Sequence, residues 1–178
     1  LSPWTDMTAS GKSYQEIADV VLSHFFTNFT ADERKAMIAS AYNEETFRDD
    51  RIVPLHSIDT DLSVAELFHG RTLAFKDLAL SLFPYLLTAA KKQEQEKREI
   101  LILTATSGDT GKAALEGFKD VPGTNIMVFY PSEGVSPMQQ QQMQKQEGEN
   151  VRVSAIHGNF DDAQSAVKRI FADKIGRA

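Results

Sequence analysis

The first third of the chain carries apolar residues at helical spacing. Its first segment contains Ile17, Val20, Val21, Leu22, Phe25 and Phe26. Apolar positions three and four residues apart predict an amphipathic helix. Ser13 with Glu16 three positions later is a capping box, and a second segment over residues 30–42 repeats this arrangement. We therefore expect a small helical subregion over residues 1–53.

After residue 53 the pattern changes to short apolar runs that alternate with amphipathic segments. The apolar runs predict strands at 64–68, 100–103, 126–129 and 151–156. The amphipathic segments predict helices at 75–96, 110–118, 137–146 and 161–171. Strands that alternate with helices indicate a parallel sheet wrapped by helices on both faces. We therefore predict an α/β fold over residues 54–178, preceded by the helical subregion.

Composition places the chain among ordinary globular proteins. It has 178 residues, of which 42% are apolar and 25% charged, and its formal net charge is -6 at pH 7. Such a chain has no basic field for a nucleic-acid backbone, and no apolar run reaches the roughly 18 residues of a membrane span. The absence of cysteine excludes disulfides and thiolate chemistry. We expect a cytoplasmic protein without nucleic-acid or membrane partners.

The two ends of the chain suggest a fragment. It begins at Leu1 without an initiating methionine and stops at Ala178, shortly after a helical segment. The alternation of strands and helices has no evident finish there. We therefore expect the chain to be the amino-terminal part of a longer protein.

A polar loop follows the predicted strand at 100–103. It reads Thr104-Ala105-Thr106-Ser107-Gly108-Asp109-Thr110-Gly111. Ligands of open parallel sheets bind beyond the carboxyl ends of the strands, and amides at a helix start bind carboxylate or phosphate. The loop is not a nucleotide-binding P-loop, because Thr106 and Ala113 stand where that motif has glycine and a hydroxyl residue. It is a candidate anion site; the alternative is a tight turn in which Asp109 merely caps the helix.

A lysine stands in a second loop, between a predicted strand and a predicted helix. The apolar residues near Lys76 in sequence are Leu73, Ala74, Phe75 and Leu78. Apolar surroundings disfavour the charged form of an amine, and a neutral amine can attack an aldehyde to form a Schiff base. Lys76 is therefore a candidate nucleophile. The alternative is a surface lysine in the first turn of a helix, paired with Asp77 or another acid.

Two segments together resemble the threonine synthase family. Glu66-Leu67-Phe68-His69-Gly70 followed by Thr72-Leu73-Ala74-Phe75-Lys76-Asp77 is similar to that family's cofactor-lysine segment. Thr106-Ser107-Gly108-Asp109-Thr110-Gly111 is similar to its second signature, at the expected separation. The family belongs to the tryptophan-synthase-like, fold type II group of pyridoxal-phosphate enzymes. The resemblance therefore implies that fold and a pyridoxal 5'-phosphate cofactor, with no metal.

The resemblance also implies roles for individual residues. Lys76 would hold the cofactor as an internal aldimine and then act as acid and base at the substrate carbons. Phe75 and Asp109 would contact the cofactor. Related enzymes have asparagine at the position of Asp109. The substrate carboxylate would be bound by Thr106, Ser107, Gly108 and Thr110. Arg71 departs from the family, which commonly has proline there; its cation would meet a phosphate or a carboxylate, or simply face water. Lys112 is a second candidate phosphate contact.

The reaction implied by the family converts O-phospho-L-homoserine and water to L-threonine and phosphate. A phospholyase of similar sequence, which releases phosphate and a keto acid, is one alternative, and a non-catalytic fragment is another. Related enzymes on this fold act on serine, O-acetylserine or threonine, so these substrates stay open. We find no candidate in the chain for the groups that bind the cofactor phosphate and the pyridine nitrogen. The isolated fragment is therefore expected to be inactive.

Overall fold

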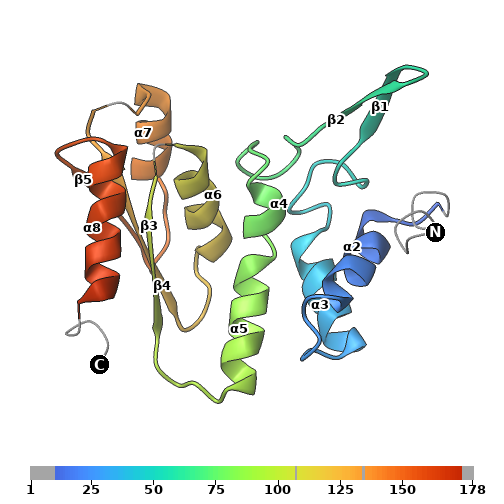
Figure 1. Ribbon diagram of the computed structural model, residues 1–178, viewed down its shortest axis with the longest axis horizontal. Helices are drawn as coiled ribbons and strands as arrows, with labels where there is room; N and C mark the ends of the chain where they lie inside the picture. Colours follow the sequence, from blue (N-terminus) through green and yellow to red (C-terminus); the bar gives the residue numbers. More distant parts are fainter. Residues whose placement is uncertain (1–10, 107, 134, 174–178) are drawn as a thin grey trace. The chain divides into compact units, whose positions relative to one another are not determined.

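The structure of the chain, a computed structural model, describes residues 11–106, 108–133 and 135–173. It divides into two compact units, Leu1–Leu86 (unit 1) and Leu87–Ala178 (unit 2). Figure 1 labels their helices and strands, and each unit is described by itself. The division after residue 53 expected from the sequence falls inside unit 1, between α3 (Ala31–Ala41) and β1 (Leu55–Asp59).

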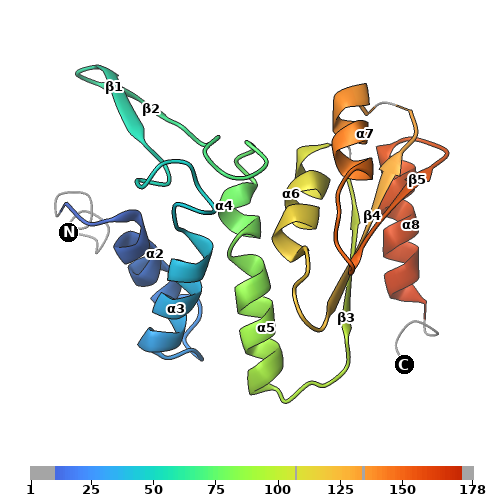
Figure 2. The same ribbon diagram turned by 180° about the vertical axis from the view of Figure 1, so that it is seen from behind.

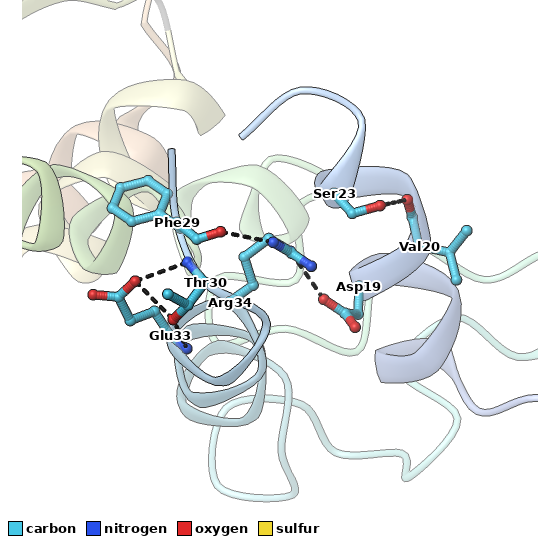
Figure 3. Close-up of polar contacts among 7 residues, drawn as sticks. All are labelled: Asp19, Val20, Ser23, Phe29, Thr30, Glu33 and Arg34. Atoms are coloured by element: carbon cyan, nitrogen blue, oxygen red, sulfur yellow. Dashed lines mark hydrogen bonds and ion pairs between the residues drawn. The ribbon is translucent and has the colours of Figure 1, made fainter. Parts of the chain in front are cut away.

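Two helices form the first part of unit 1. α2 (Tyr14–Ser23) and α3 begin at the two predicted capping boxes. In the second box, the Thr30 hydroxyl accepts from the Glu33 N–H at 3.3 Å, and the Glu33 carboxylate accepts from the Thr30 N–H at 2.8 Å (Figure 3). A box of this kind supplies partners to N–H groups that the first helical turn leaves unpaired. Both predicted helices are confirmed, although α2 ends before Phe25, which is 71% exposed.

An ion pair joins α2 to α3. Arg34 Nε donates to Asp19 Oδ1 at 3.1 Å, and Arg34 Nη1 donates to the Phe29 carbonyl at 2.8 Å (Figure 3). The two charged side chains are mostly buried. The buried apolar residues of this unit include Phe29, Met37, Ile38, Ala41, Tyr42, Phe47, Ile52 and Leu82. Unit 1 therefore has a core of its own.

An antiparallel hairpin precedes the lysine loop. In it, β1 pairs with β2 (Leu62–Ala65). Every residue of both strands is exposed. The sequence prediction missed β1 and placed the next strand at 64–68, because exposed strands show neither a buried apolar run nor a clear alternation.

The continuous helix predicted over 75–96 is wrong. Two helices occupy this range, α4 (Asp77–Leu80) and α5 (Phe83–Gln93). Pro84 lies in the first turn of α5, where its missing N–H costs nothing. In a continuous helix the same proline would clash with the carbonyl four residues earlier and leave it without a donor. The break therefore leaves α4 as a helix of 4 residues directly after Lys76.

Unit 2 is built on a parallel sheet in the order β3-β4-β5. The strands are β3 (Ile100–Ala105), β4 (Thr124–Pro131) and β5 (Val151–Ile156). The helices are α6 (Asp109–Phe118), α7 (Pro137–Gln144) and α8 (Phe160–Ala172). As Figure 1 and the reverse view in Figure 2 show, α6 and α7 lie on one face of the sheet and α8 on the other. The predicted α/β class is confirmed.

The core of unit 2 lies between the sheet and its helices. Ile126 and Val128 of β4 and Leu115 of α6 are completely buried. Met143 of the glutamine-rich α7 is also completely buried, whereas Met138 is 71% exposed. Met143 thus gives this polar helix a contact with the core.

No helix in the described part of the chain has the length and apolar character of a membrane span. The same residues contain no cluster of three or more histidine, cysteine, aspartate or glutamate side chains suited to a metal ion.

Candidate active site

Lys76 ends the loop that joins the hairpin to α4. Its backbone takes the N-cap position of α4, and its carbonyl accepts from the Leu80 N–H at 2.9 Å. Its side chain is half-buried, with Nζ 4.5 Å from the centre of the Phe75 ring. Among the residues that the structure describes, none forms a hydrogen bond or ion pair with this amine. Asp77, the partner in the surface-lysine alternative, binds Thr72 instead, so the amine is available to a carbonyl compound.

The apolar neighbours of Lys76 in sequence do not enclose it within unit 1. Leu73 is 53% exposed and Phe75 is 55% exposed. In a turn, successive side chains point in different directions, so neighbours in sequence do not form one apolar wall. Apolar surroundings for the lysine therefore stay a prediction.

A glutamate bridges two histidines at the start of the lysine loop. Glu66 Oε2 lies 2.6 Å from His69 Nε2, and Glu66 Oε1 lies 3.2 Å from His56 Nε2. His69 is largely buried and stacks on Phe68, with ring centres 4.8 Å apart. His69 Nε2 is therefore paired with Glu66, and this contact links the two ends of residues 66–69. Sequence reasoning missed His56, which belongs to the strand that it did not predict.

The polar loop of unit 2 wraps around the Thr106 side chain. The Thr106 hydroxyl accepts from the N–H groups of Gly108 at 3.0 Å and Gly111 at 2.9 Å, and donates to the Gly108 carbonyl at 3.0 Å. A hydroxyl has one donor and two acceptor positions, so this one is fully used inside the loop. Thr106 therefore shapes the loop, and its direct contact with a substrate stays a prediction.

The start of α6 keeps two backbone donors. No described residue accepts from the N–H of Asp109 or Thr110, the first two amides of the helix. Such amides, together with the helix dipole, attract anions. Asp109 is the first residue of α6, and among the described residues no side chain caps the helix; the Asp109 carboxylate accepts from Gln139 Nε2 at 3.1 Å. The available part of the predicted carboxylate site is therefore these two amides; Ser107 lies outside the described residues.

The two candidate phosphate contacts differ in their surroundings. Lys112 Nζ donates to the side-chain carbonyl of Gln146, whose Nε2 donates to the Glu116 carboxylate at 3.0 Å. An ammonium group has three N–H donors, so the bond to Gln146 uses one of them and does not exclude a phosphate. Arg71 is exposed in the lysine loop.

The two candidate loops belong to different units. Lys76, Phe75 and Arg71 lie in unit 1, whereas the loop that begins at Thr106 and the helix that carries Lys112 lie in unit 2. A single site that joins the two loops stays a prediction.

Among curated proteins, the chain is similar to threonine synthases. The enzyme of Schizosaccharomyces pombe is 39% identical, over 97% of this chain and 34% of its own length. The enzyme of Pseudomonas aeruginosa is 40% identical, over 92% of this chain and 34% of its own length. The chain therefore spans about a third of the length of these relatives. No family model matches it.

Solved structures give the same result. The pyridoxal-phosphate-bound threonine synthase of Brucella melitensis has a TM-score of 0.84 and 40% identity to this chain, covering 98% of it and 37% of the solved chain. The comparisons confirm the resemblance that the two motifs indicated. Nearly the whole chain is similar to a part of the threonine synthases.

Proposed function

We propose that the chain is part of a threonine synthase, which converts O-phospho-L-homoserine and water to L-threonine and phosphate. The observation that carries the proposal is the 40% identity and TM-score of 0.84 to a pyridoxal-phosphate-bound threonine synthase over 98% of this chain. The chemistry of Lys76 supports it, because no described residue forms a hydrogen bond or ion pair with its amine.

The residues present fit pyridoxal phosphate at its aldehyde end. When bound, this cofactor supplies an electron sink for charge that develops beside the substrate nitrogen. The Lys76 amine would hold the aldehyde carbon and later carry protons between substrate carbons. Phe75 contacts that amine with the face of its ring, and an aromatic face suits a planar heterocycle. The groups for the cofactor phosphate and pyridine nitrogen would come from the two thirds of the relatives' length that this chain does not span.

The substrate would bind its carboxylate at the start of α6. The N–H groups of Asp109 and Thr110 and the Thr110 hydroxyl would donate to it, because no described residue occupies them. Thr106 and Gly108 would act by keeping these donors in place. Phosphate leaves the terminal carbon of the substrate, water adds at the neighbouring carbon, and Arg71 would meet the phosphate charge.

The test compares three proteins: the full-length protein that contains this chain, its Lys76→Ala variant and its Lys35→Ala variant. Lys35 is an exposed lysine on α3 of the same unit and serves as the matched control. Each protein is reconstituted with pyridoxal phosphate. The absorbance of the lysine-bound cofactor is recorded, and O-phosphohomoserine turnover is followed by product analysis.

Loss of both the absorbance and threonine formation in Lys76→Ala alone would establish the cofactor, the lysine and the reaction together. An unchanged absorbance in that variant would move the cofactor to another residue. Phosphate and keto acid without threonine would identify the phospholyase instead. A cytoplasmic location stays a prediction from composition.

A further inference from the structure

The chain before Lys76 is tied to the residue that follows it. The Asp77 carboxylate accepts two hydrogen bonds from Thr72, one at Oδ2 from the backbone N–H at 2.8 Å and one at Oδ1 from the hydroxyl at 2.7 Å. Asp77 is only 4% exposed. The hydrogen bonds between Thr72 and Asp77 therefore close residues 72–77 into a loop, and Lys76 is part of that loop.

Two further features show how closely this loop is fitted. A Cβ atom at Gly70 would lie 2.7 Å from Asp77 Cγ, closer than non-bonded carbon atoms approach. Leu73 has a φ of +64°, in the left-handed region that residues with a side chain rarely adopt. Strained backbone persists where the surrounding structure imposes it. The two bonds from Thr72 to Asp77 hold the residue directly before Leu73 and so impose this conformation.

The chain after Lys76 is tied to the helical subregion. The Tyr42 hydroxyl donates to the Leu78 carbonyl in α4 at 2.7 Å. The Tyr42 ring is buried between Tyr14 and Phe47, with ring centres 4.9 Å and 5.9 Å away. Burial raises the pKa of the Tyr42 hydroxyl, which therefore remains a donor. A helix of 4 residues cannot hold itself in place, and Tyr42 supplies an external attachment.

We propose that Asp77 and Tyr42 are positioning residues for Lys76, which hold the chain on its two sides so that the amine is directed to one place. This inference rests on the proposed function, in which the Lys76 amine binds the aldehyde of pyridoxal phosphate. Asp77 acts through Thr72, and Tyr42 acts through the Leu78 carbonyl. The lysine side chain is long and flexible, so its amine is placed only as accurately as its backbone. An error of about 1 Å in such a group lowers a rate by as much as roughly 100-fold.

Four variants separate this role from simple stabilisation. Thr72→Val removes the hydroxyl and keeps the shape of the side chain, whereas Thr72→Ser keeps the hydroxyl. Tyr42→Phe removes the hydroxyl, and with it the hydrogen bond to the Leu78 carbonyl, and leaves the ring packing. Asp77→Asn can accept from the Thr72 N–H and donate to its hydroxyl, so it keeps the geometry without the charge. Thr60→Val is the matched control, because the Thr60 hydroxyl also lies beside a carboxylate, that of Asp59, but in the exposed turn of the hairpin.

The full-length, cofactor-loaded protein is measured for kcat and KM per loaded site. The cofactor-free protein is measured for its temperature of unfolding and for the rate at which borohydride reduction fixes added pyridoxal phosphate on Lys76. Thr72→Val and Tyr42→Phe are expected to lower both kcat and the fixation rate by about 10-fold to 100-fold, with KM little changed. Thr72→Ser, Asp77→Asn and Thr60→Val are expected to stay within about threefold of the original protein.

Two outcomes would overturn the inference. In the first, Thr72→Val and Tyr42→Phe lower the temperature of unfolding while kcat per loaded site and the fixation rate stay unchanged. In the second, Thr72→Ser is as slow as Thr72→Val, so that the hydroxyl is irrelevant. Failure of the original protein to bind pyridoxal phosphate on Lys76 is a separate result, which overturns the proposed function and this inference with it.

Discussion

The Thr106 hydroxyl lies 2.9 Å from the backbone nitrogen of Gly111, and this contact leaves no room for a side chain at position 111. A Cβ atom there would meet the Thr106 methyl group and lie 2.7 Å from Thr106 Cβ. Because Thr106 is 2% exposed, it has no free space to move into.

Gly111→Ala is expected to lower the free energy of unfolding by about 1–3 kcal/mol through this overlap, even though alanine favours a helix by about 1 kcal/mol over glycine. Thr106→Ser removes the methyl group and should recover part of the loss. Urea denaturation of the original chain, both single variants and the double variant measures the coupling. If the loss of unfolding free energy in the double variant equalled the sum of the losses in the two single variants, the side chains at positions 106 and 111 would not clash.

Leu73→Gly is expected to be more stable than Leu73→Ala by about 1 kcal/mol. The left-handed backbone at φ +64° destabilises an alanine by roughly 1–2 kcal/mol but does not destabilise a glycine. Glycine in turn destabilises the fold by about 0.5–1 kcal/mol, because it makes the unfolded chain more flexible. Leu73 is 53% exposed, so loss of apolar contacts contributes little. Thermal unfolding of the two variants provides the comparison, and an alanine variant that is equally stable would contradict the strain.

Two leucines of unit 2 are expected to respond differently to truncation. Leu115→Ala should lower the free energy of unfolding by about 2–5 kcal/mol, because the side chain is completely buried on α6. Leu101→Ala should change it by less than about 0.5 kcal/mol, since this residue of β3 is 54% exposed. Urea denaturation measures both. If the loss at Leu101 were as large as that at Leu115, the exposed side of β3 would be covered in solution.

The Glu96–Arg98 ion pair predicts a pH effect. The hydrogen bonds from Arg98, followed by its charge, lower the pKa of Glu96 from 4.5 to about 2, and Arg98 Nη2 lies 2.6 Å from Glu96 Oε2. A lowered carboxyl pKa contributes stability above the unfolded value of 4.5, and this contribution is lost as the pH falls towards 2. Both side chains belong to an exposed turn, so the effect on the whole protein is small.

Arg98→Met is expected to raise the Glu96 titration from about 2 part of the way towards 4.5, because the side-chain hydrogen bonds and the charge are lost while the backbone N–H groups of residues 97 and 98 still donate; NMR of the carboxyl carbon measures it. Asp49 is the internal control. Hydrogen bonds from Arg51 lower its pKa independently, so its titration should not respond to Arg98→Met. A Glu96 titration that stays near 2 in the variant would show that the Arg98 side chain is not the cause.

Elements with local signals were predicted accurately. The capping boxes at Ser13 and Thr30 mark the starts of α2 and α3, and β5 has the predicted bounds, Val151–Ile156. A cap depends on residues three positions apart, and a buried strand shows itself as an apolar run. β1 was missed because its exposed residues have no such pattern. The break before α5 followed from Pro84, a local signal that the apolar periodicity concealed.

The sequence by itself determined the α/β class, the two candidate loops and, through the resemblance of their motifs, Lys76 as the candidate cofactor lysine. Only the tertiary structure decided which polar groups in and beside those loops are occupied. The Thr106 hydroxyl is used inside its own loop, and the Leu78 carbonyl finds its donor in Tyr42, 36 residues earlier. Partners of this kind are chosen by the packing of segments far apart in the chain, because each buried polar group must find a partner wherever the fold provides one.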